Sequence, residues 1–159
     1  GKNRRYVMYH SLYLQKVGEP TVRINTYNEW KIVPSSRPLF NPPPVKEEYV
    51  DIPGRQDGPL DLTGTLTGLR YGKRTGSWEF YVLNRNQPND WDWYDKFSDI
   101  QNRLNGYFYN VWLEDDPLHY YVCKLTVNSW QSPKDYSRVT INYEADPIAK
   151  DSPGGYYHA

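Results

Sequence analysis

Apolar and polar residues alternate most regularly between Ser77 and Leu83. Trp78, Phe80 and Val82 occupy every second position, and polar or amphipathic side chains fill the positions between them. Because successive side chains of a strand point to opposite faces, this alternation predicts a β-strand that is buried mainly on one side.

Three further runs with this period follow, over Tyr109 to Leu113, His119 to Trp130 and Arg138 to Glu144. Pro117 and the cluster Ser132-Pro133-Lys134-Asp135 supply turn chemistry between them. Since short turns join antiparallel neighbours, the sequence predicts a three-stranded antiparallel meander. The side chains expected on its buried face are Tyr121, Cys123, Leu125, Val127, Val139, Ile141 and Tyr143.

One segment has the period of an α-helix instead. Its apolar residues recur three or four positions apart, at Trp93, Phe97, Ile100 and Leu104. Asp90 or Asp92 can cap its start, and Gly106 stands where a left-handed residue commonly ends a helix. We expect this apolar stripe, the Phe97 ring included, to be buried against a sheet.

The first third of the chain is richer in turns. An N-terminal hairpin is expected on either side of Val17-Gly18-Glu19-Pro20, and a further strand over Val45 to Ile52. Five prolines from Pro34 to Pro44 remove backbone donors, so that segment is expected to be extended and to run over the core.

Together these patterns predict a mainly β (α+β) fold. The expected architecture is a β-sandwich or open barrel of about seven strands with one packed helix. A chain of 159 residues is expected to form one domain, here over residues 1–150. No core-forming period follows Ala149, and Pro153-Gly154-Gly155 interrupts the chain, so residues 151–159 are expected to be a flexible tail.

The stretch from Gly54 to Gly76 is a long excursion rich in Gly, Asp and Thr. Loops longer than about 12–15 residues inside a compact domain are usually functional or irregular. Its leucines and Tyr71 indicate that it is ordered against something, either a partner subunit or its own core. Both charge signs accompany the leucines, which suits a contact between unlike surfaces of neighbouring copies in a ring. The candidate interface residues are Arg55, Asp57, Leu60, Asp61, Leu62, Leu66, Leu69, Arg70 and Arg74.

Composition narrows the range of partners. Lysine plus arginine, 19 residues, equals aspartate plus glutamate, 19 residues, so no net positive field favours nucleic acid as the primary ligand. The chain also has 16 tyrosines and 6 tryptophans. These side chains combine rigid apolar area with a polar tip, which suits both half-buried strands and subunit contacts.

Cys123 is the single cysteine, which excludes an internal disulfide and is typical of a chain that folds in a reducing cytoplasm. Its position in mid-strand predicts a buried thiol that is not a nucleophile. No apolar run approaches the roughly 18 residues that span a bilayer. The polar, basic start lacks the apolar segment of a signal peptide.

The sequence contains no convincing motif for binding a metal ion or a phosphate group. His10, His119 and His158 are far apart, and none stands in a metal-binding spacing, so we assign no metal and no cofactor. The stretch from Gly68 to Thr75 resembles a phosphate-binding loop only faintly, because its glycine spacing is too short, and a glycine-rich turn is the better interpretation.

The acidic cluster Glu114-Asp115-Asp116 is the strongest candidate for catalysis. Two same-face carboxylates on a strand lie roughly 7 Å apart, within the range of about 6.5–9.5 Å of inverting glycosidases. The cluster ends a strand and precedes Pro117, however, where carboxylates commonly accept backbone hydrogen bonds. We therefore expect these groups to serve a turn, and we assign no catalytic residue.

Short motifs in collinear order resemble the family of phage distal tail proteins. In the first half they are Met8-Tyr9-His10-Ser11-Leu12, Thr26-Tyr27-Asn28-Glu29-Trp30, Val33-Pro34-Ser35-Ser36-Arg37-Pro38, Asn41-Pro42-Pro43, Tyr49-Val50-Asp51-Ile52-Pro53-Gly54 and Leu60-Asp61-Leu62-Thr63. In the second half they are Leu66-Thr67-Gly68, Tyr71-Gly72, Arg74-Thr75-Gly76-Ser77-Trp78-Glu79-Phe80, Leu104-Asn105-Gly106, Leu113-Glu114-Asp115-Asp116-Pro117, Tyr120-Tyr121 and Val127-Asn128-Ser129-Trp130. The resemblance covers the chain from about Met8 to Lys150.

This resemblance implies a β-sandwich with one helix that assembles into a hexameric ring at the tip of a phage tail. The ring would contact the tail tube protein on one side and a hub or fibre protein on the other, with a lumen through which DNA passes. Such a protein is assembled in the host cytoplasm and resides in the virion. It needs no cofactor and touches no membrane.

The chain departs from the family pattern in two places. Residues 13–23 lengthen the approach to Thr26, which leaves the shape of the N-terminal hairpin open. The chain also stops soon after Asp146-Pro147, without the second, carbohydrate-binding-like domain of longer relatives. We therefore expect receptor recognition to fall to another component.

Two functions follow from these patterns. The first is a ring-forming structural protein, supported by the excursion, the aromatic surplus and the balanced charge. The alternative is a carbohydrate-binding module or glycan hydrolase of the tail tip, in which aromatic rings stack on sugars and Glu114 and Asp116 supply carboxylates.

Overall fold

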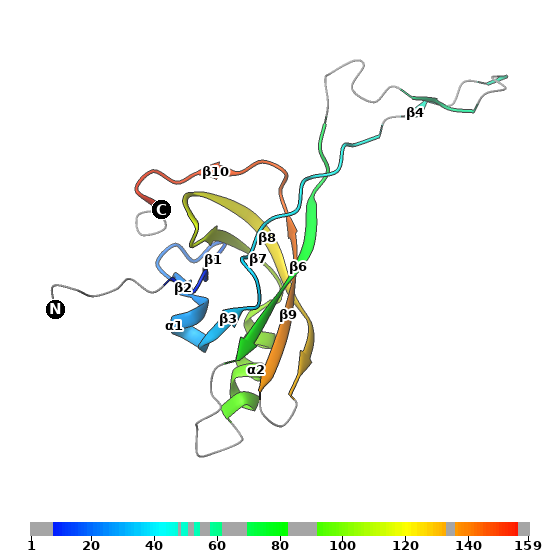
Figure 1. The fold of residues 1–159 in the computed structure, drawn as a ribbon. Helices are drawn as coiled ribbons and strands as arrows, with labels where there is room; N and C mark the ends of the chain where they lie inside the picture. The colour runs from blue at the N-terminus through cyan, green and yellow to red at the C-terminus, as the bar shows by residue number, and fades with distance from the viewer. Residues whose placement is uncertain are drawn as a thin grey trace.

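The computed structural model describes residues 8–47, 49–50, 53–54, 58–61, 70–82, 92–132 and 136–155. Most of them belong to one curled antiparallel sheet (Figure 1). In spatial order its strands are β2 (Ile24–Asn25), β1 (Leu12–Lys16), β7 (Asn105–Leu113), β8 (Asp116–Gln131), β9 (Ser137–Ala145), β6 (Arg74–Val82) and β3 (Ile32–Pro34). β10 (Lys150–Asp151) also pairs with β8, whereas β4 (Tyr49–Val50) and β5 (Leu60–Asp61) form a separate two-stranded sheet.

The two edges of the main sheet, β2 and β3, are neighbours in sequence. Only the short helix α1 (Thr26–Trp30) and Lys31 separate them. A five-residue helix is roughly 7–8 Å long, so the sheet must curl until its edges nearly meet. The fold is therefore mainly β, as predicted, and it adopts the open-barrel form of the two architectures that the sequence allowed.

Helix α1 is a second helix that the sequence pattern did not predict. Its start is capped by Asn25, whose side-chain oxygen accepts the backbone amides of Tyr27 (2.9 Å) and Asn28 (3.1 Å). The hydroxyl of Thr26 accepts the amide of Leu12, and the Trp30 ring is 2% exposed. Five residues are too few to show a helical period, which explains the omission.

The predicted helix is α2 (Asp92–Arg103), and it contacts β7 and β8. Ile100 and Leu104 are buried as expected. Phe97 is only partly buried and lies 5.1 Å from the ring of Trp130, so the expectation of a fully covered ring was wrong. Gly106 has the expected positive φ, of 85°, but lies at the start of β7 beside a register shift.

The meander β7–β8–β9 and strand β6 agree with their sequence predictions. Trp78, Phe80 and Val82 of β6 are buried, and β6 pairs with β9 along its full length. The inward residues of β8 and β9 form the centre of the core. Its most completely buried aliphatic and aromatic members are Leu12, Leu14, Ile32, Phe80, Ile100, Leu104, Val111, Leu125 and Ile141.

The proline-rich segment is extended and follows the edge of β6 beyond β3. The amide of Ser35 donates to the carbonyl oxygen of Glu79 (2.9 Å). The indole nitrogen of Trp78 donates to the carbonyl oxygen of Leu39 (3.0 Å). The side-chain amide nitrogen of Asn41 donates to the carbonyl oxygen of Thr75 (2.8 Å). The proline-rich segment has few backbone N–H donors of its own, and it covers the edge of β6. This cover protects the edge from pairing with other chains.

A second aromatic cluster lies on the outer face of the sheet. Trp112 follows Val111, which points into the core, so its own side chain points outward, yet it is 0% exposed. The Arg23 guanidinium lies 4.4 Å from its ring centroid, and the Tyr120 ring lies 4.8 Å away. The predicted N-terminal hairpin is present, since β1 pairs with β2. Arg23, the residue before β2, covers this tryptophan.

Residues 150–152 make backbone contacts with β8, and the flexibility expected of residues 151–159 stays a prediction. Lys150 and Asp151 pair with Tyr120 and His119 of β8, and Ser152 is buried. β10 continues on the side of β8 that β9 occupies farther along, so backbone pairing outweighs the absence of an apolar period. Residues 156–159 lie outside the described part of the chain. Among the described residues, no helix is long and apolar enough to cross a membrane.

Candidate subunit interface

The excursion predicted from Gly54 to Gly76 has different bounds in the structure: its two ends pair with each other at residues 45–46 and 70–71, and residues 74–76 belong to β6. Val45 forms a β-bridge with Tyr71, and the amide of Lys46 donates to the carbonyl oxygen of Arg70 at 2.7 Å. The side chains of Val45 and Tyr71 are 42% and 45% exposed. The root of the excursion is thus held by backbone pairing and presents apolar surface to its surroundings.

Beyond this root, β4 and β5 pair with each other, Tyr49 with Asp61 and Val50 with Leu60. Among the described strands, neither joins the main sheet. Figure 1 shows them standing away from the barrel, at the end opposite to α2. A two-stranded sheet on its own is at best marginally stable in water, so contact with another surface would stabilise it.

The structure locates some of the predicted interface residues. Leu60 and Asp61 lie on β5, and Arg70 is exposed at the root of the excursion. The remaining leucines and two charged residues lie outside the described part of the chain: Arg55, Asp57, Leu62, Leu66 and Leu69. Their contact with a neighbouring subunit stays a prediction.

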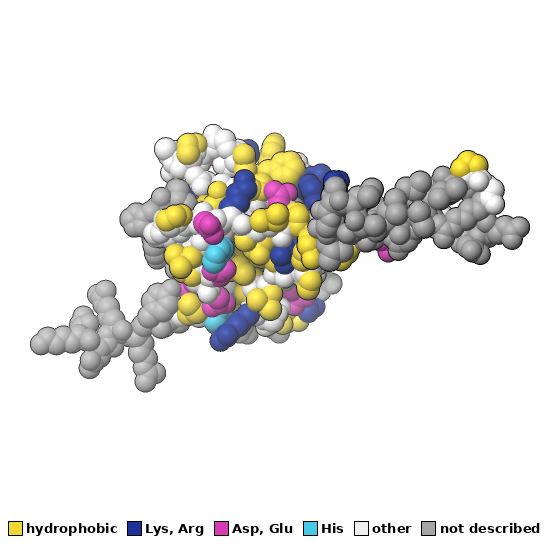
Figure 2. Space-filling model, turned by 90° about the horizontal axis from the view of Figure 1, so that it is seen from above, with side chains coloured by type: hydrophobic (Ala, Val, Ile, Leu, Met, Phe, Trp, Pro, Cys, Tyr) yellow, Lys and Arg dark blue, Asp and Glu magenta, His cyan; other side chains and the backbone are white. Residues whose placement is uncertain are grey.

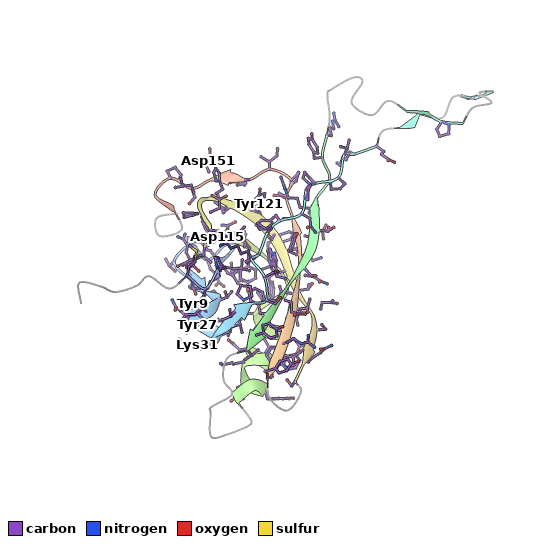
Figure 3. The ribbon with its side chains drawn as sticks, in the orientation of Figure 1. Tyr9, Tyr27, Lys31, Asp115, Tyr121 and Asp151 are labelled. Carbon is purple, nitrogen blue, oxygen red and sulfur yellow. The ribbon has the colours of Figure 1, made fainter. Side chains whose placement is uncertain are left out.

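Arg74 makes several contacts within its own subunit, and its part in a subunit interface stays a prediction. Its guanidinium donates to the carbonyl oxygen of Pro147 from Nε (3.0 Å) and Nη2 (2.9 Å), and to that of Asn41 from Nη1 (3.3 Å). It also lies 5.1 Å from the ring centroid of Tyr121, which Figure 3 labels. The side chain joins β6 to the segment after β9 within one subunit.

The acidic cluster serves a turn, as predicted. Glu114 and Asp115 form the two-residue turn between β7 and β8. Glu114 is 7% exposed, and its Oε2 accepts the backbone amide of Ser11 at 2.8 Å. Its own amide donates to the carbonyl oxygen of Ser11 at 3.0 Å. The carboxylate therefore fastens the segment before β1 to the meander.

The two neighbouring aspartates pair with histidines. Asp115 lies 2.9 Å from Nδ1 of His10, and Asp116 lies 2.9 Å from Nδ1 of His119. Asp151 of β10 approaches Nε2 of His119 at 3.6 Å. Figure 2 shows histidine and acidic side chains in a row on one face. No group of three or more His, Cys, Asp or Glu in the described residues is arranged to hold a metal ion.

We predict that Asp116→Asn lowers the pKa of His119 toward about 6.5, the value of an unperturbed histidine. The hydrogen bond and charge of Asp116 raise this pKa in the folded chain. A raised folded-state pKa stabilises the fold below the unfolded-state value, and the contribution is lost as pH rises through the folded pKa. A histidine titration by NMR measures the change.

The matched control is Asp151→Asn, whose contact with His119 is longer and whose effect on the pKa should be smaller. An equal pKa in the wild type and in Asp116→Asn would contradict the assignment of the Asp116 pair.

The single cysteine has the environment that its position predicted. Cys123 is 0% exposed, and burial raises the pKa of its thiol well above the ordinary range. A protonated, buried thiol is a poor nucleophile. Its place in β8 is a packing position.

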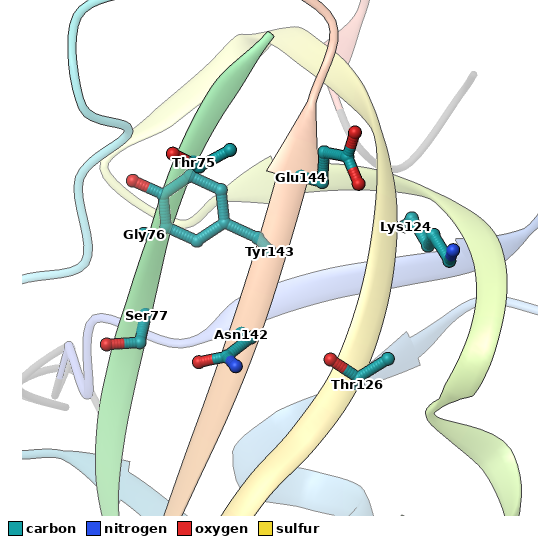
Figure 4. A pocket seen from close by; sticks show the side chains of 8 residues that line it. All are labelled: Thr75, Gly76, Ser77, Lys124, Thr126, Asn142, Tyr143 and Glu144. Carbon is teal, nitrogen blue, oxygen red and sulfur yellow. The ribbon is translucent and has the colours of Figure 1, made fainter.

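A polar hollow of about 470 Å³ lies on the outer face of β6, β9 and β8 (Figure 4). Its side chains include Ser77, Lys124, Thr126 and Asn142. Tyr143 is its aromatic member, and that ring is 3% exposed. Sugar binding by stacking needs an accessible aromatic face, which this hollow does not offer.

The rings of Tyr9 and Tyr27 also contact other side chains of the same chain. Tyr9 stacks on Tyr27 with 3.8 Å between ring centroids, and the Lys31 ammonium lies 4.9 Å from the Tyr27 centroid. Figure 3 labels the three side chains close together. Tyr27 is therefore engaged within the chain and makes a poor platform for a sugar.

Comparison with known proteins gives a likeness among solved structures. No protein-family model matches the chain, and no curated protein matches it. Among solved structures, it is similar to the SPP1 Dit (gp 19.1) protein, described as a paradigm of the hub adsorption apparatus in phages that infect Gram-positive bacteria. The TM-score is 0.54 and the sequence identity 13%, over 89% of this chain and 52% of that one.

The chain thus spans about half the length of the solved structure that it matches. At this level of identity the likeness shows the fold alone. The chain has a fold that also occurs in a phage adsorption protein, which agrees with the fold implied by its sequence motifs.

Proposed function

We propose that this chain is a structural subunit of a phage tail tip that assembles into a ring, with a hexamer as the expected form. The ring joins the tail tube protein to a hub or fibre protein and lets DNA pass through its lumen. The subunit works by assembly and catalyses no reaction. Its location is the virion, after assembly in the host cytoplasm.

The observation that carries this proposal is the match in fold to SPP1 Dit over most of the chain. The collinear motifs from Met8 to Lys150 point to the same family independently of the coordinates. The small sheet of β4 and β5 adds a physical reason for assembly, because among the described strands it pairs with none of the main sheet, and a two-stranded sheet alone is at best marginally stable in water.

Ring geometry suits an excursion of this kind. In a rotationally symmetric ring, each subunit meets its two neighbours through different surfaces. An excursion that leaves one side of the barrel can therefore reach the same receiving surface on each next subunit. Its leucines would supply burial, and its charges would set orientation and association rate more than affinity.

The mass of the purified protein in solution tests this proposal. Light scattering is expected to give a species of about six times the chain mass of 18.8 kDa. Arg70→Glu should weaken that species and alter its salt dependence, because it reverses an exposed charge at the root of the excursion, and circular dichroism checks that the subunit is still folded. Arg74→Glu is unsuitable, because it would break contacts inside the subunit.

The rival function predicts a different result from the same sample. A monomer at every concentration that also binds cell-wall glycan would support a carbohydrate-binding module and contradict the ring. Electron microscopy of the isolated species separates a closed ring from an irregular aggregate of similar mass.

A further inference from the structure

The start of β7, just after α2, holds the one Asn-Gly dipeptide of the chain, Asn105-Gly106. An asparagine that precedes a glycine can react with its own backbone. The reason is steric, because glycine has no Cβ to hinder the approach of its amide nitrogen to the asparagine side chain. In a folded chain the reaction also needs an exposed side chain and a backbone that opens locally.

The surroundings of Asn105 meet the first of these needs and part of the second. Its side chain is exposed, and no hydrogen bond within the described part of the chain holds its amide group. The pairing of β1 with β7 ends at Tyr109, and the amide of Val17 donates to the carbonyl oxygen of Phe108 (2.9 Å). Residues 105–107 therefore lie beyond the end of β1, and β8 is their remaining neighbour among the described strands.

A β-bulge loosens the same place further. Between the cross-strand pairs Asn105–Thr126 and Phe108–Lys124, β7 has two residues and β8 has one. Gly106 is the first of the two, and its φ of 85° is the left-handed conformation that a glycine commonly adopts there. A bulge leaves a residue of the ladder unpaired, so fewer hydrogen bonds must break before the backbone can turn.

The bulge also explains why a glycine follows Asn105. A side chain at position 106 would be strained at this φ, whatever the space around it. The glycine that lets β7 begin with a bulge therefore also leaves Asn105 open to attack. Reactivity at this position is a consequence of the fold and not only of the local sequence.

We infer that Asn105 is a site of spontaneous deamidation in the folded chain. The amide nitrogen of Gly106 loses its proton to hydroxide, attacks Cγ of Asn105 and expels ammonia, which leaves a five-membered succinimide. Water then opens the ring. Opening at Cγ restores the normal peptide bond and gives aspartate, whereas opening at the α-carbonyl carbon gives isoaspartate, whose backbone is one carbon longer. Either route consumes one water and releases one ammonia.

Both products place a carboxylate two residues after the end of α2. The C-terminus of a helix carries partial negative charge, so a new negative charge is unfavourable there. Arg103 is the basic residue of the last turn, but its guanidinium already contacts Glu29 at 2.9 Å and Asp99 at 3.7 Å. Asn105→Asp carries the charge without the longer backbone, and it should raise the equilibrium constant of unfolding roughly two- to fivefold.

Peptide mapping by mass spectrometry, during storage of the folded chain at mildly alkaline pH, tests the inference. Trypsin recovers Asn105 in the peptide 104–124 and Asn128 in the next peptide, 125–134. Asn128 is the matched internal control, because it is also exposed beside a register shift but precedes a serine. Asn105 is expected to convert several-fold faster, into two products of equal mass that separate by chromatography.

Asn105→Gln is the control variant. It keeps a neutral amide, but its cyclisation needs a six-membered ring and is slower, so the peptide 104–124 should stay unchanged. The same mapping in urea gives the rate of the unfolded chain. If Asn105 converts in urea but stays intact in the folded chain, or if Asn128 converts as fast, the inference is overturned. The inference does not rest on the proposed ring, and neither result bears on the mass that light scattering measures.

Discussion

Replacing Trp112 by alanine is expected to lower the free energy of unfolding by about 3–5 kcal/mol, the usual cost of removing a buried aromatic ring. Trp112 is 0% exposed, although it lies on the outer face of the sheet. Arg23 and Tyr120 contact its ring, so the substitution removes both contacts and leaves a space between them and the sheet. Urea unfolding monitored by circular dichroism measures the change.

Tyr94→Ala is the control for this substitution. Tyr94 is an aromatic residue of α2 that is 48% exposed, so its removal should cost less than about 1 kcal/mol. A similar loss for both variants would show that the outer-face cluster contributes no more than an exposed ring.

A second large effect is expected at Trp30, where alanine should also cost about 3–5 kcal/mol. The ring is 2% exposed, and its indole nitrogen donates to Asp99 of α2 at 2.7 Å. Arg103 of α2 pairs with Glu29 of α1 at 2.9 Å. Trp30 therefore anchors α1 both in the core and on α2, at the place where the barrel nearly closes.

Trp30→Phe separates burial from hydrogen bonding. Phenylalanine keeps most of the apolar contact and loses the bond to Asp99, so the expected cost is about 1–2 kcal/mol. Both variants can be compared by the midpoint of urea unfolding at constant m-value. A cost for phenylalanine equal to that for alanine would assign the stability to the hydrogen bond and contradict the packing argument.

The strands of the core could be predicted because their periodicity reflects burial directly. Phe80 in β6, Leu125 in β8 and Ile141 in β9 lie at every-second-position sites, and each is fully or almost fully buried. A local pattern decides such positions, since a strand with one covered face must alternate. The helical period likewise placed Ile100 of α2 and Leu104, the residue after α2, correctly in the core.

Features that depend on contacts between distant segments could not be predicted in this way. Trp112 is buried by Arg23, which no period around Trp112 reveals. Arg74 donates to Pro147, a contact across 73 positions of the chain that its local sequence does not reveal. β10 is held by backbone pairing with β8 and not by burial of its side chains, so its sequence shows no apolar period.

β2 and β3 are close in sequence but lie at the two edges of the main sheet, so the strands between them pair over long sequence separations. This strand order has a consequence for folding kinetics. β1 pairs with β7 residues about 100 positions later in the chain, and β6, which carries β3, pairs with β9. Pairings of such large sequence separation are slow to form, whereas the meander β7–β8–β9 is local. We therefore expect the meander to act as the template on which the N-terminal half condenses. During synthesis on a ribosome, β3 and β6 cannot join the main sheet before β9 has been made. Only chains that extend through β9 could therefore present a complete assembly surface.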